Sequence, residues 1–162
     1  MFICLKDAVK KYGEGEAAVY ALDHADLVIG KGKICVILGP SGSGKSTILN
    51  MLGALELEPY RRRFPRELSG GQQQRAAIAR AMIKNPRLLL CDELTGALDT
   101  CSSKNVLRFV EKMNRKYGTT VVIITHNEAI AKMADQVIRI WDGRVEESVL
   151  NEKKIPAEEL EL

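Results

Sequence analysis

The stretch that decides the fold is GPSGSGKST, which occupies residues 39–47. It fits the pattern G-x-x-x-x-G-K-[ST], in which glycines let backbone N–H groups converge on a phosphate chain. The apolar run ICVIL at 34–38 precedes it, and an apolar stripe at helical spacing follows from Ile48. The motif therefore stands between a strand and a helix N-terminus, where the helix dipole favours negative charge. The sequence predicts a phosphate-binding loop.

The side chains of this loop have distinct expected parts. Lys45 is predicted to neutralise the outer phosphates and to assist catalysis, while Ser46 presents its hydroxyl to Mg²⁺. The predicted nucleotide contacts are all nine residues: Gly39, Pro40, Ser41, Gly42, Ser43, Gly44, Lys45, Ser46 and Thr47. The alternative is a Gly/Ser turn with an incidental lysine, which the flanking strand and helix disfavour.

A pair of carboxylates follows the apolar run LLLC, in RLLLCDE at 87–93. A carboxylate at the end of a buried strand can hold Mg²⁺ through water, and the next one can polarise the attacking water. We assign Asp92 to the metal and Glu93 to the general base. Without the phosphate loop, a solvated acidic turn would be the better interpretation.

The segment LSGGQQQR at 68–75 opens another helical run. Its candidate nucleotide contacts are Ser69, Gly70, Gly71 and Gln72, which offer N–H groups and a hydroxyl at a helix start. A chain with two separate anion-binding helix starts can close on ATP as a head-to-tail pair. One subunit would then supply the loop and the other this second surface.

Two further residues gain a meaning only beside these motifs. His126 follows the apolar run VVIIT, where a lone histidine is more often structural, and here it is a candidate contact of the γ-phosphate and a catalytic residue. Tyr12, expected in a turn, is a candidate for stacking on adenine.

Length and composition point to one globular domain. The 162 residues include 46% hydrophobic and 28% charged residues, with a net charge of +3 that is too small to indicate nucleic acid or a membrane surface. No apolar run approaches the roughly 20 residues of a membrane span, and the start lacks a signal-peptide pattern, so a cytoplasmic protein is expected. Cys4, Cys35 and Cys91 lie in strand-like runs and are expected to be buried, and no cysteine spacing suggests zinc or a disulfide.

Hydrophobic periodicity predicts alternating strands and helices and so a largely parallel sheet with helices on both faces. The expected strands are 2–9, 21–29, 34–38, 88–91, 121–125, 136–141 and 144–146. One helix is expected to begin near Gly44, and three more are expected over 70–83, 102–116 and 128–133. Gly118 is expected to cap the helix at 102–116, and Asp142-Gly143 to form a hairpin turn. The tail after Val149 is charged, and its sequence is compatible with either a short helix or a frayed end.

Together these motifs resemble the ATP-binding subunit of an ABC transporter. GPSGSGKST is similar to that family's Walker A, LSGGQ to its signature and LLLCDE to its Walker B. His126 matches the switch histidine, Tyr12 the adenine-stacking aromatic, and ALD at 97–99 the D-loop, so Asp99 is expected to meet the partner subunit and its nucleotide. The resemblance covers nearly all of 1–147, leaving 148–162 as a charged tail.

The resemblance implies a function as well as an α/β, P-loop NTPase fold. TGALD at 95–99, THN at 125–127 and MADQVIRIWDGR at 133–144 are most similar to exporters of peptides, lipoproteins and macrolides. Members bind ATP and Mg²⁺, close as dimers, hydrolyse ATP and drive a membrane permease. The protein is therefore expected at the inner face of the cell membrane.

The chain departs from the family between Thr47 and Ser69, where only residues 48–68 intervene. The family has a much longer stretch there, with a β-subdomain, a strand ending in the Q-loop glutamine and most of a helical subdomain. No glutamine precedes Gln72, and FPRELSGGQ resumes the family pattern at Phe64, which puts the junction at about 55–63. The loss is expected to leave 88–91 as an edge strand and to weaken hydrolysis and coupling. Leu94, where the family has proline, is expected to shift Glu93 slightly.

Two alternatives to the function of a transporter ATPase subunit remain. One is a non-catalytic nucleotide-binding remnant or regulatory interaction protein, and the other is an ABC-type ATPase of DNA repair, whose long insertions before the signature are absent here. The basic run at 61–63 with Arg66 is expected to be a solvated loop rather than a nucleic-acid site.

Overall fold

The computed structural model describes residues 2–56, 74–75, 77–78, 80–81 and 85–162. The strands are β1 (Ile3–Tyr12), β2 (Val19–Ile29), β3 (Ile34–Leu38), β4 (Leu88–Asp92), β5 (Thr120–Thr125), β6 (Gln136–Trp141) and β7 (Arg144–Leu150). The helices are α1 (Lys45–Glu56), α3 (Thr100–Tyr117) and α4 (Glu128–Ala131), with 3-10 turns η1 (Gly15–Ala17) and η2 (Ala157–Glu159). The described residues between 74 and 81 are also helical.

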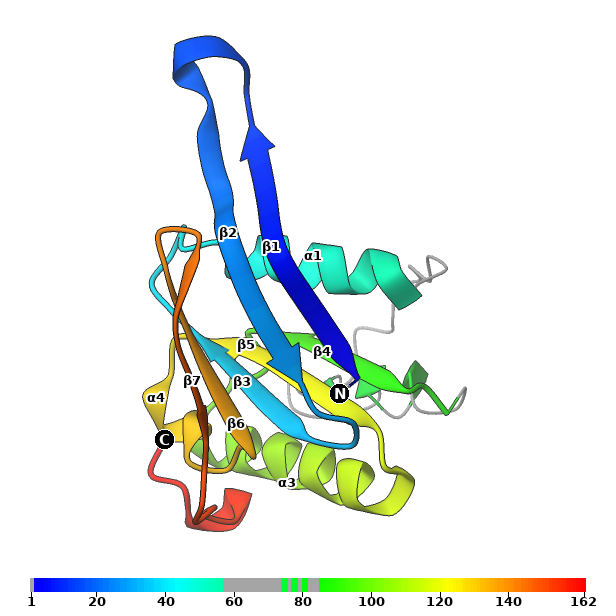
Figure 1. The fold of residues 1–162 in the computed structure, drawn as a ribbon. Helices are drawn as coiled ribbons and strands as arrows, with labels where there is room; N and C mark the ends of the chain where they lie inside the picture. The colour runs from blue at the N-terminus through cyan, green and yellow to red at the C-terminus, as the bar shows by residue number, and fades with distance from the viewer. Residues whose placement is uncertain (1, 57–73, 76, 79, 82–84) are drawn as a thin grey trace.

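A five-stranded sheet in the order β4-β5-β3-β6-β7 forms the centre of the molecule. β3 pairs in parallel with both β5 and β6, and β4 pairs in parallel with β5, whereas β7 returns antiparallel to β6. The hairpin of β1 and β2 and the helix α1 lie over one face of this sheet, and α3 lies on the other (Figure 1). The predicted α/β fold with a mainly parallel sheet is confirmed.

The continuous apolar run of β3 divides its side chains between two cores. Ile34, Val36 and Leu38 pack with α3, while Cys35 and Ile37 pack with α1 and the β1–β2 hairpin. β5 alternates in the same way, and all its residues are buried. A parallel strand that is covered on both faces needs such a run, because successive side chains point to opposite faces.

β4 occupies one end of the sheet, as the shortened sequence predicted. Among the described residues it pairs only with β5, from Leu88 opposite Thr120 to Asp92 opposite Ile124. Its side chains alternate between half-buried and buried until the exposed Asp92. The end of β4 therefore presents its carboxylates at the rim of the sheet.

The N-terminal hairpin differs from the prediction in two ways. Its strands extend further than 2–9 and 21–29, so that Tyr12 pairs with Val19 inside the ladder and does not lie in a turn. The expectation that Cys4 is buried is wrong, because it lies on the outer face of the hairpin opposite the exposed Val28. Cys35 and Cys91 are buried as expected.

Local signals set the ends of α3 and the β6–β7 turn. The Asp99 carboxylate accepts a hydrogen bond of 2.9 Å from Ser102 N. Hydrogen bonding with the Ser102 side chain, and then with its backbone N–H, holds the pKa of Asp99 below its usual value. At the other end Gly118 adopts a φ of 66°, a left-handed conformation that favours glycine, and its N–H donates to Asn114 O. Asp142 and Gly143 both have positive φ, as a tight two-residue hairpin requires.

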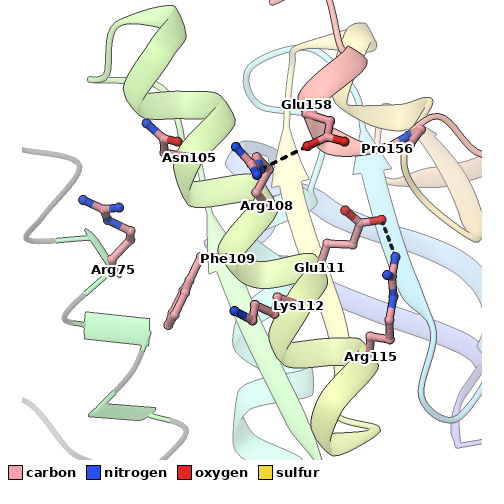
Figure 2. Close-up of a pocket in the computed structure, with 9 residues that line it drawn as sticks. All are labelled: Arg75, Asn105, Arg108, Phe109, Glu111, Lys112, Arg115, Pro156 and Glu158. Atoms are coloured by element: carbon pink, nitrogen blue, oxygen red, sulfur yellow. Dashed lines mark hydrogen bonds and ion pairs between the residues drawn. The ribbon is translucent and has the colours of Figure 1, made fainter.

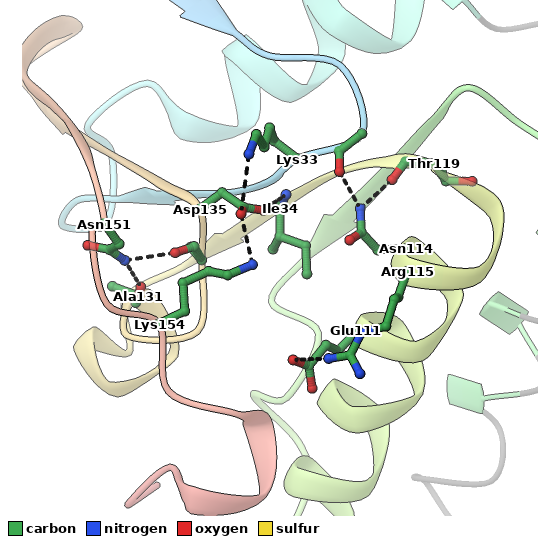
Figure 3. Close-up of polar contacts among 12 residues, drawn as sticks. Lys33, Ile34, Glu111, Asn114, Arg115, Thr119, Ala131, Asp135, Asn151 and Lys154 are labelled. Atoms are coloured by element: carbon green, nitrogen blue, oxygen red, sulfur yellow. Dashed lines mark hydrogen bonds and ion pairs between the residues drawn. The ribbon is translucent and has the colours of Figure 1, made fainter.

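The tail is packed rather than frayed. β7 continues to Leu150, beyond the expected strand end, and Ala157 and Leu160 are buried against the α3 side of the core. Asn151 donates from its side chain to Ala131 O and Ala134 O at 2.9 and 2.8 Å (Figure 3). These contacts attach the last residues to the turn that follows α4.

Asp135 is the centre of a second group of polar contacts in Figure 3. It accepts from Ile34 N and from Lys154 Nζ, both at 2.8 Å, and lies 3.7 Å from Lys33 Nζ. Partial burial opposes its ionisation, but the hydrogen bonds from Lys154 and Ile34 and the nearby positive charges win and hold the pKa of Asp135 below its usual value. Asp135 thus joins the start of β3 to the tail.

Candidate functional site

The phosphate loop connects the carboxyl end of β3 to α1, and close backbone contacts leave no room for a side chain at two of its glycines. A Cβ on Gly44 would lie 2.3 Å from Ala21 O, and Gly44 has a φ of 100°. A Cβ on Gly39 would lie 2.3 Å from Ile140 O. Only glycine allows the loop to pass this close to β2 and β6.

The β6–β7 turn supports the loop from the side. Gly143 N donates to Ser43 O at 3.1 Å, and Asp23 N donates to Gly143 O at 3.0 Å, so the turn links the loop to β2. Sequence reasoning identified Asp142-Gly143 as a turn but missed this contact. Nothing in the local sequence places the turn against the loop, because the contact depends on the pairing of β3 with β6.

Lys45 lies at the first position of α1 and is only 8% exposed. Its Nζ donates to Gly39 O at 2.7 Å and to Pro40 O at 2.6 Å, so the ammonium group closes the loop on itself. The N–H groups of the first turn of a helix have no intrahelical acceptor. The loop therefore combines unpaired N–H donors at the start of α1 with a positive charge on a buried stem.

Ser43 carries the one buried side-chain oxygen or nitrogen in the described residues that lacks a hydrogen-bond partner. Its Oγ lies 2.5 Å from the position that a Cβ on Gly39 would take. A buried hydroxyl without a partner is costly unless a ligand or water completes it. The loop thus has unused hydrogen-bonding capacity close to its lysine.

A pocket of about 350 Å³ lies between the phosphate loop and the ends of β4 and β5. Its lining residues are Ser41, Gly42, Lys45, Ser46, Asp92, Glu93, Ile124 and His126. Four of the nine predicted loop contacts, both predicted metal contacts and all three predicted catalytic side chains therefore line one cavity, whereas Gly39, Pro40, Ser43, Gly44 and Thr47 do not line it. Ile124, which the sequence did not single out, forms its apolar floor.

Glu93 and His126 form a hydrogen-bonded pair in this pocket. The distance from His126 Nδ1 to Glu93 Oε1 is 3.0 Å, and the side chains are 72% and 40% exposed. Glu93 has a φ of 45°, a strained value for a residue with a side chain, and its N–H donates to Ile124 O at 2.9 Å. The strained turn aims the carboxylate back over the end of β5.

The groups at the mouth of the pocket suit a magnesium ion that is shared with a phosphate. Ser46 and Asp92 are both exposed and line the same cavity. Within the described residues no group of three or more His, Cys, Asp or Glu side chains could hold a metal on its own. Mg²⁺ is usually bound by one or two carboxylates together with substrate phosphates, so this sparse set fits.

Two predicted contacts lie away from the pocket. Tyr12, near the end of the projecting hairpin, is 51% exposed, and Lys10 Nζ lies 5.3 Å from its ring centroid (Figure 1). Asp99 serves as the helix cap described above. Neither lines the pocket of the phosphate loop.

The predicted signature contacts Ser69, Gly70, Gly71 and Gln72 lie outside the described residues, and so does the junction predicted at about 55–63 from residue 57 onward. The described helix behind them is anchored near the catalytic pair, because Gln74 Nε2 donates to Leu94 O at 3.1 Å. Leu94 itself is buried in the core next to α3.

A protein-family model described as "ABC transporter" matches residues 22–61 and 52–96. The uncharacterized ABC transporter ATP-binding protein MJ0796 of Methanocaldococcus jannaschii is 32% identical over 89% of this chain and 95% of its own length. A putative ABC transporter ATP-binding protein, the MG467 homolog of Mycoplasma pneumoniae, is 32% identical over 86% of this chain and 63% of its own. The macrolide export ATP-binding/permease protein MacB of Hyphomonas neptunium is 32% identical, but this chain spans 33% of it.

Solved structures show the same fold. A dimeric post-hydrolysis structure of MJ0796 bound to ADP and Pi matches with a TM-score of 0.76 and 29% identity, over 91% of this chain and 97% of that chain. A nucleotide-free ATP-binding cassette matches with a TM-score of 0.78 at 20% identity, which supports the fold alone.

The alignments also reveal the shortening. The alignment with MJ0796 extends over 223 residues, more than the 162 residues of this chain, so the relative has residues without a counterpart here. Among the described residues, no helix combines the length and the apolar character needed to cross a membrane.

Proposed function

Because the chain belongs to the ATP-binding proteins of ABC transporters, we propose that it binds Mg-ATP at the loop 39–47 and hydrolyses it slowly. The observation that carries the proposal is the shared pocket, in which the buried Lys45 faces the pair Glu93–His126. In this proposal residues 1–147 form the ATP-binding domain and 148–162 the tail that packs on it.

The chemistry follows from the positions of these side chains. The N–H groups at the start of α1 and the ammonium group of Lys45 bind the phosphates, and Lys45 exchanges its loop carbonyls for a phosphate oxygen. Glu93 accepts a proton from the attacking water, and His126, bonded to Glu93, contacts the γ-phosphate. Ser46 and Asp92 would hold Mg²⁺, which would neutralise the charge that develops on the phosphates.

Slow turnover is expected for a structural reason. The family's Q-loop glutamine has no counterpart between Thr47 and Ser69, and the side chains of the pair His126–Glu93 are 72% and 40% exposed. An exposed pair is less well held in a reactive geometry than a buried one, and small displacements lower rates strongly.

The partners proposed for the protein come from its relatives. MJ0796 is a dimer in its solved structure, and MacB combines an ATP-binding part with a permease. We infer a head-to-tail dimer in which Ser69–Gln72 and Asp99 of one copy complete the nucleotide site of the other. A membrane permease of the macrolide or lipoprotein exporter type is the inferred partner, which would hold the protein at the inner face of the membrane.

Calorimetric titration with Mg-ATP and steady-state hydrolysis test this proposal on the same protein. Lys45→Ala is expected to weaken ATP binding at least about tenfold, because it removes the only charged group at the loop. Lys31→Ala is the matched control, since Lys31 is an exposed lysine outside the pocket. Glu93→Gln is expected to lower turnover about a hundredfold and to leave ATP binding intact.

Each result points to a different conclusion. Equal ATP binding by the wild type and by Lys45→Ala would overturn the proposal that ATP binds at the loop 39–47. Binding with no turnover sensitive to Glu93→Gln would favour the non-catalytic remnant, the second candidate, which the missing glutamine supports.

A further inference from the structure

The second cavity of interest lies on the far side of the molecule from the phosphate loop, on the outer face of α3. Its volume is about 590 Å³, within the range of about 300–1,000 Å³ that small-molecule sites occupy. Its lining residues are Arg75, Asn105, Arg108, Phe109, Glu111, Lys112, Arg115, Pro156 and Glu158 (Figure 2). None of them lines the pocket of the phosphate loop.

The charges of this cavity are not balanced evenly. Both acidic side chains are engaged with an arginine, Glu158 with Arg108 Nε at 3.4 Å and Glu111 with Arg115 at 3.3 Å. Within the described part of the chain, Arg75 and Lys112 contact no acidic side chain. The cavity therefore retains two positive charges, which favour an anionic ligand.

The unpaired cations share one side of the cavity with an aromatic ring. Figure 2 shows Asn105, Phe109 and Lys112 on the side of α3 that faces Arg75, whereas the ion pair of Arg108 with Glu158 lies away from it. Phe109 is half-buried and packs against the core, so the ring is supported from behind. Asn105 is exposed, and its amide makes only a contact of 3.7 Å with Cys101 Sγ.

These groups match a ligand with two parts. A guanidinium and an ammonium group bind a phosphate, a ring face stacks on a flat heterocycle, and an exposed amide can pair with the edge of that heterocycle. We propose that this cavity is a second, non-catalytic site for a nucleoside monophosphate. Arg75 and Lys112 bind the phosphate, and Phe109 and Asn105 bind the base.

The position of the site gives such a ligand a means to act on the ATPase. Arg75 follows Gln74, whose side chain donates a hydrogen bond to Leu94 O, next to Glu93. On the other side of the Glu93 turn, α3 begins after its cap Asp99. A ligand that bridges this helix and α3 would fix the two segments that flank the Glu93 turn. The site itself does not depend on hydrolysis by the protein.

The test is a titration of the ¹⁵N-labelled full chain with AMP, followed by NMR. Saturable shifts are expected at the amides of residues 105–112, and Arg75→Glu and Lys112→Glu should each weaken that binding about tenfold. Lys153→Glu is the control for net charge, because Lys153 is exposed and lies outside the cavity. Shifts at residues 39–47 report separately on the phosphate loop.

Two simpler ligands and one further variant divide the site into its parts. Inorganic phosphate and adenosine should each bind more weakly than AMP, and Phe109→Leu, which keeps an apolar side chain against the core, should weaken AMP but not phosphate. The proposal is overturned if AMP shifts only the loop amides, or if Lys112→Glu binds AMP as well as Lys153→Glu does. If inorganic phosphate bound as tightly as AMP, the proposal that Phe109 and Asn105 bind the base would be wrong.

Discussion

The phosphate loop and the Glu93 turn lie at the same edge of one sheet, but they are held very differently. The loop is enclosed by β2 and the β6–β7 turn, with backbone contacts to Gly39, Gly44 and Gly143, and its lysine is 8% exposed. The Glu93 turn follows the end strand β4, and its partner His126 is 72% exposed. The predicted phosphate-binding lysine is thus buried, whereas the predicted catalytic pair Glu93–His126 is largely exposed.

The difference suggests which part of the proposed function depends more on the shortened segment. The segment between Thr47 and Ser69 is short, yet the close backbone contacts of the phosphate loop in the described part of the chain come from β2, β6 and the β6–β7 turn. Among the described residues β4 is an end strand of the sheet, and it carries Asp92 and leads to Glu93. Under the proposed function, loss of residues there is expected to affect hydrolysis before nucleotide binding.

The largest effect is expected from glycine substitutions in the two regions. Gly44→Ala would force a Cβ to within 2.3 Å of Ala21 O at a φ of 100°, and we expect it to destabilise the protein by about 3 kcal/mol or more. Gly96→Ala, in the Glu93 turn, would place its Cβ at an ordinary 3.6 Å from Glu93 O and should change stability by less than about 0.5 kcal/mol. Urea denaturation measures both.

A control separates crowding from backbone strain. Gly42 also has a positive φ, of 81°, but its Cβ would meet nothing within 4 Å, so Gly42→Ala should cost only about 1–2 kcal/mol. If Gly44→Ala and Gly96→Ala proved equally stable, the loop would not be the more constrained region.

A smaller effect is expected where α4 begins. Asn127 caps α4 by accepting from Ala129 N at 2.9 Å, and it directly follows His126. Asn127→Ala should destabilise the protein by about 1 kcal/mol and lower ATP turnover, because the cap fixes the backbone beside His126. Asn127→Asp keeps the cap and is the matched control. Turnover unchanged in Asn127→Ala would show that His126 is positioned by Glu93 alone.

The smallest effect concerns the two buried thiols, Cys35 in β3 and Cys91 in β4. Burial raises the pKa of each to about 12, so the native thiols stay neutral and react only after the strand opens. Cys91 lies on the end strand and should therefore be labelled a few-fold faster than Cys35 in mild denaturant. Both rates should rise with pH as the opened thiols ionise near their ordinary value of about 8.5.

The exposed Cys4 and Cys101 provide the internal reference, since they need no opening and should react first. Mass spectrometry of the labelled chain distinguishes the four sites. Cys35 and Cys91 labelled at one common rate would mean that β4 opens only with the whole domain, contrary to the comparison above.

Several features of this molecule were predictable because their causes are local. The alternation that divides β3 and β5 between two cores follows from their apolar runs, and Gly118 ends α3 because a left-handed residue closes a helix. The position of β4 at the end of the described sheet, by contrast, was expected only from the resemblance, because the family's strand beside it has no counterpart here. Cys4 was predicted wrongly because an apolar strand that faces solvent on one side looks like a buried one.

The sequence by itself determined that a phosphate loop stands between a strand and a helix, and that two carboxylates and a histidine each follow an apolar strand. These are matters of residue type and spacing. Only the tertiary structure decided that the Asp142–Gly143 turn supports the loop, that Glu93 bonds His126, and that Arg75 and Phe109 share a cavity. Such contacts join segments far apart in the chain, and pairing and packing of the whole sheet, rather than any local pattern, bring them together.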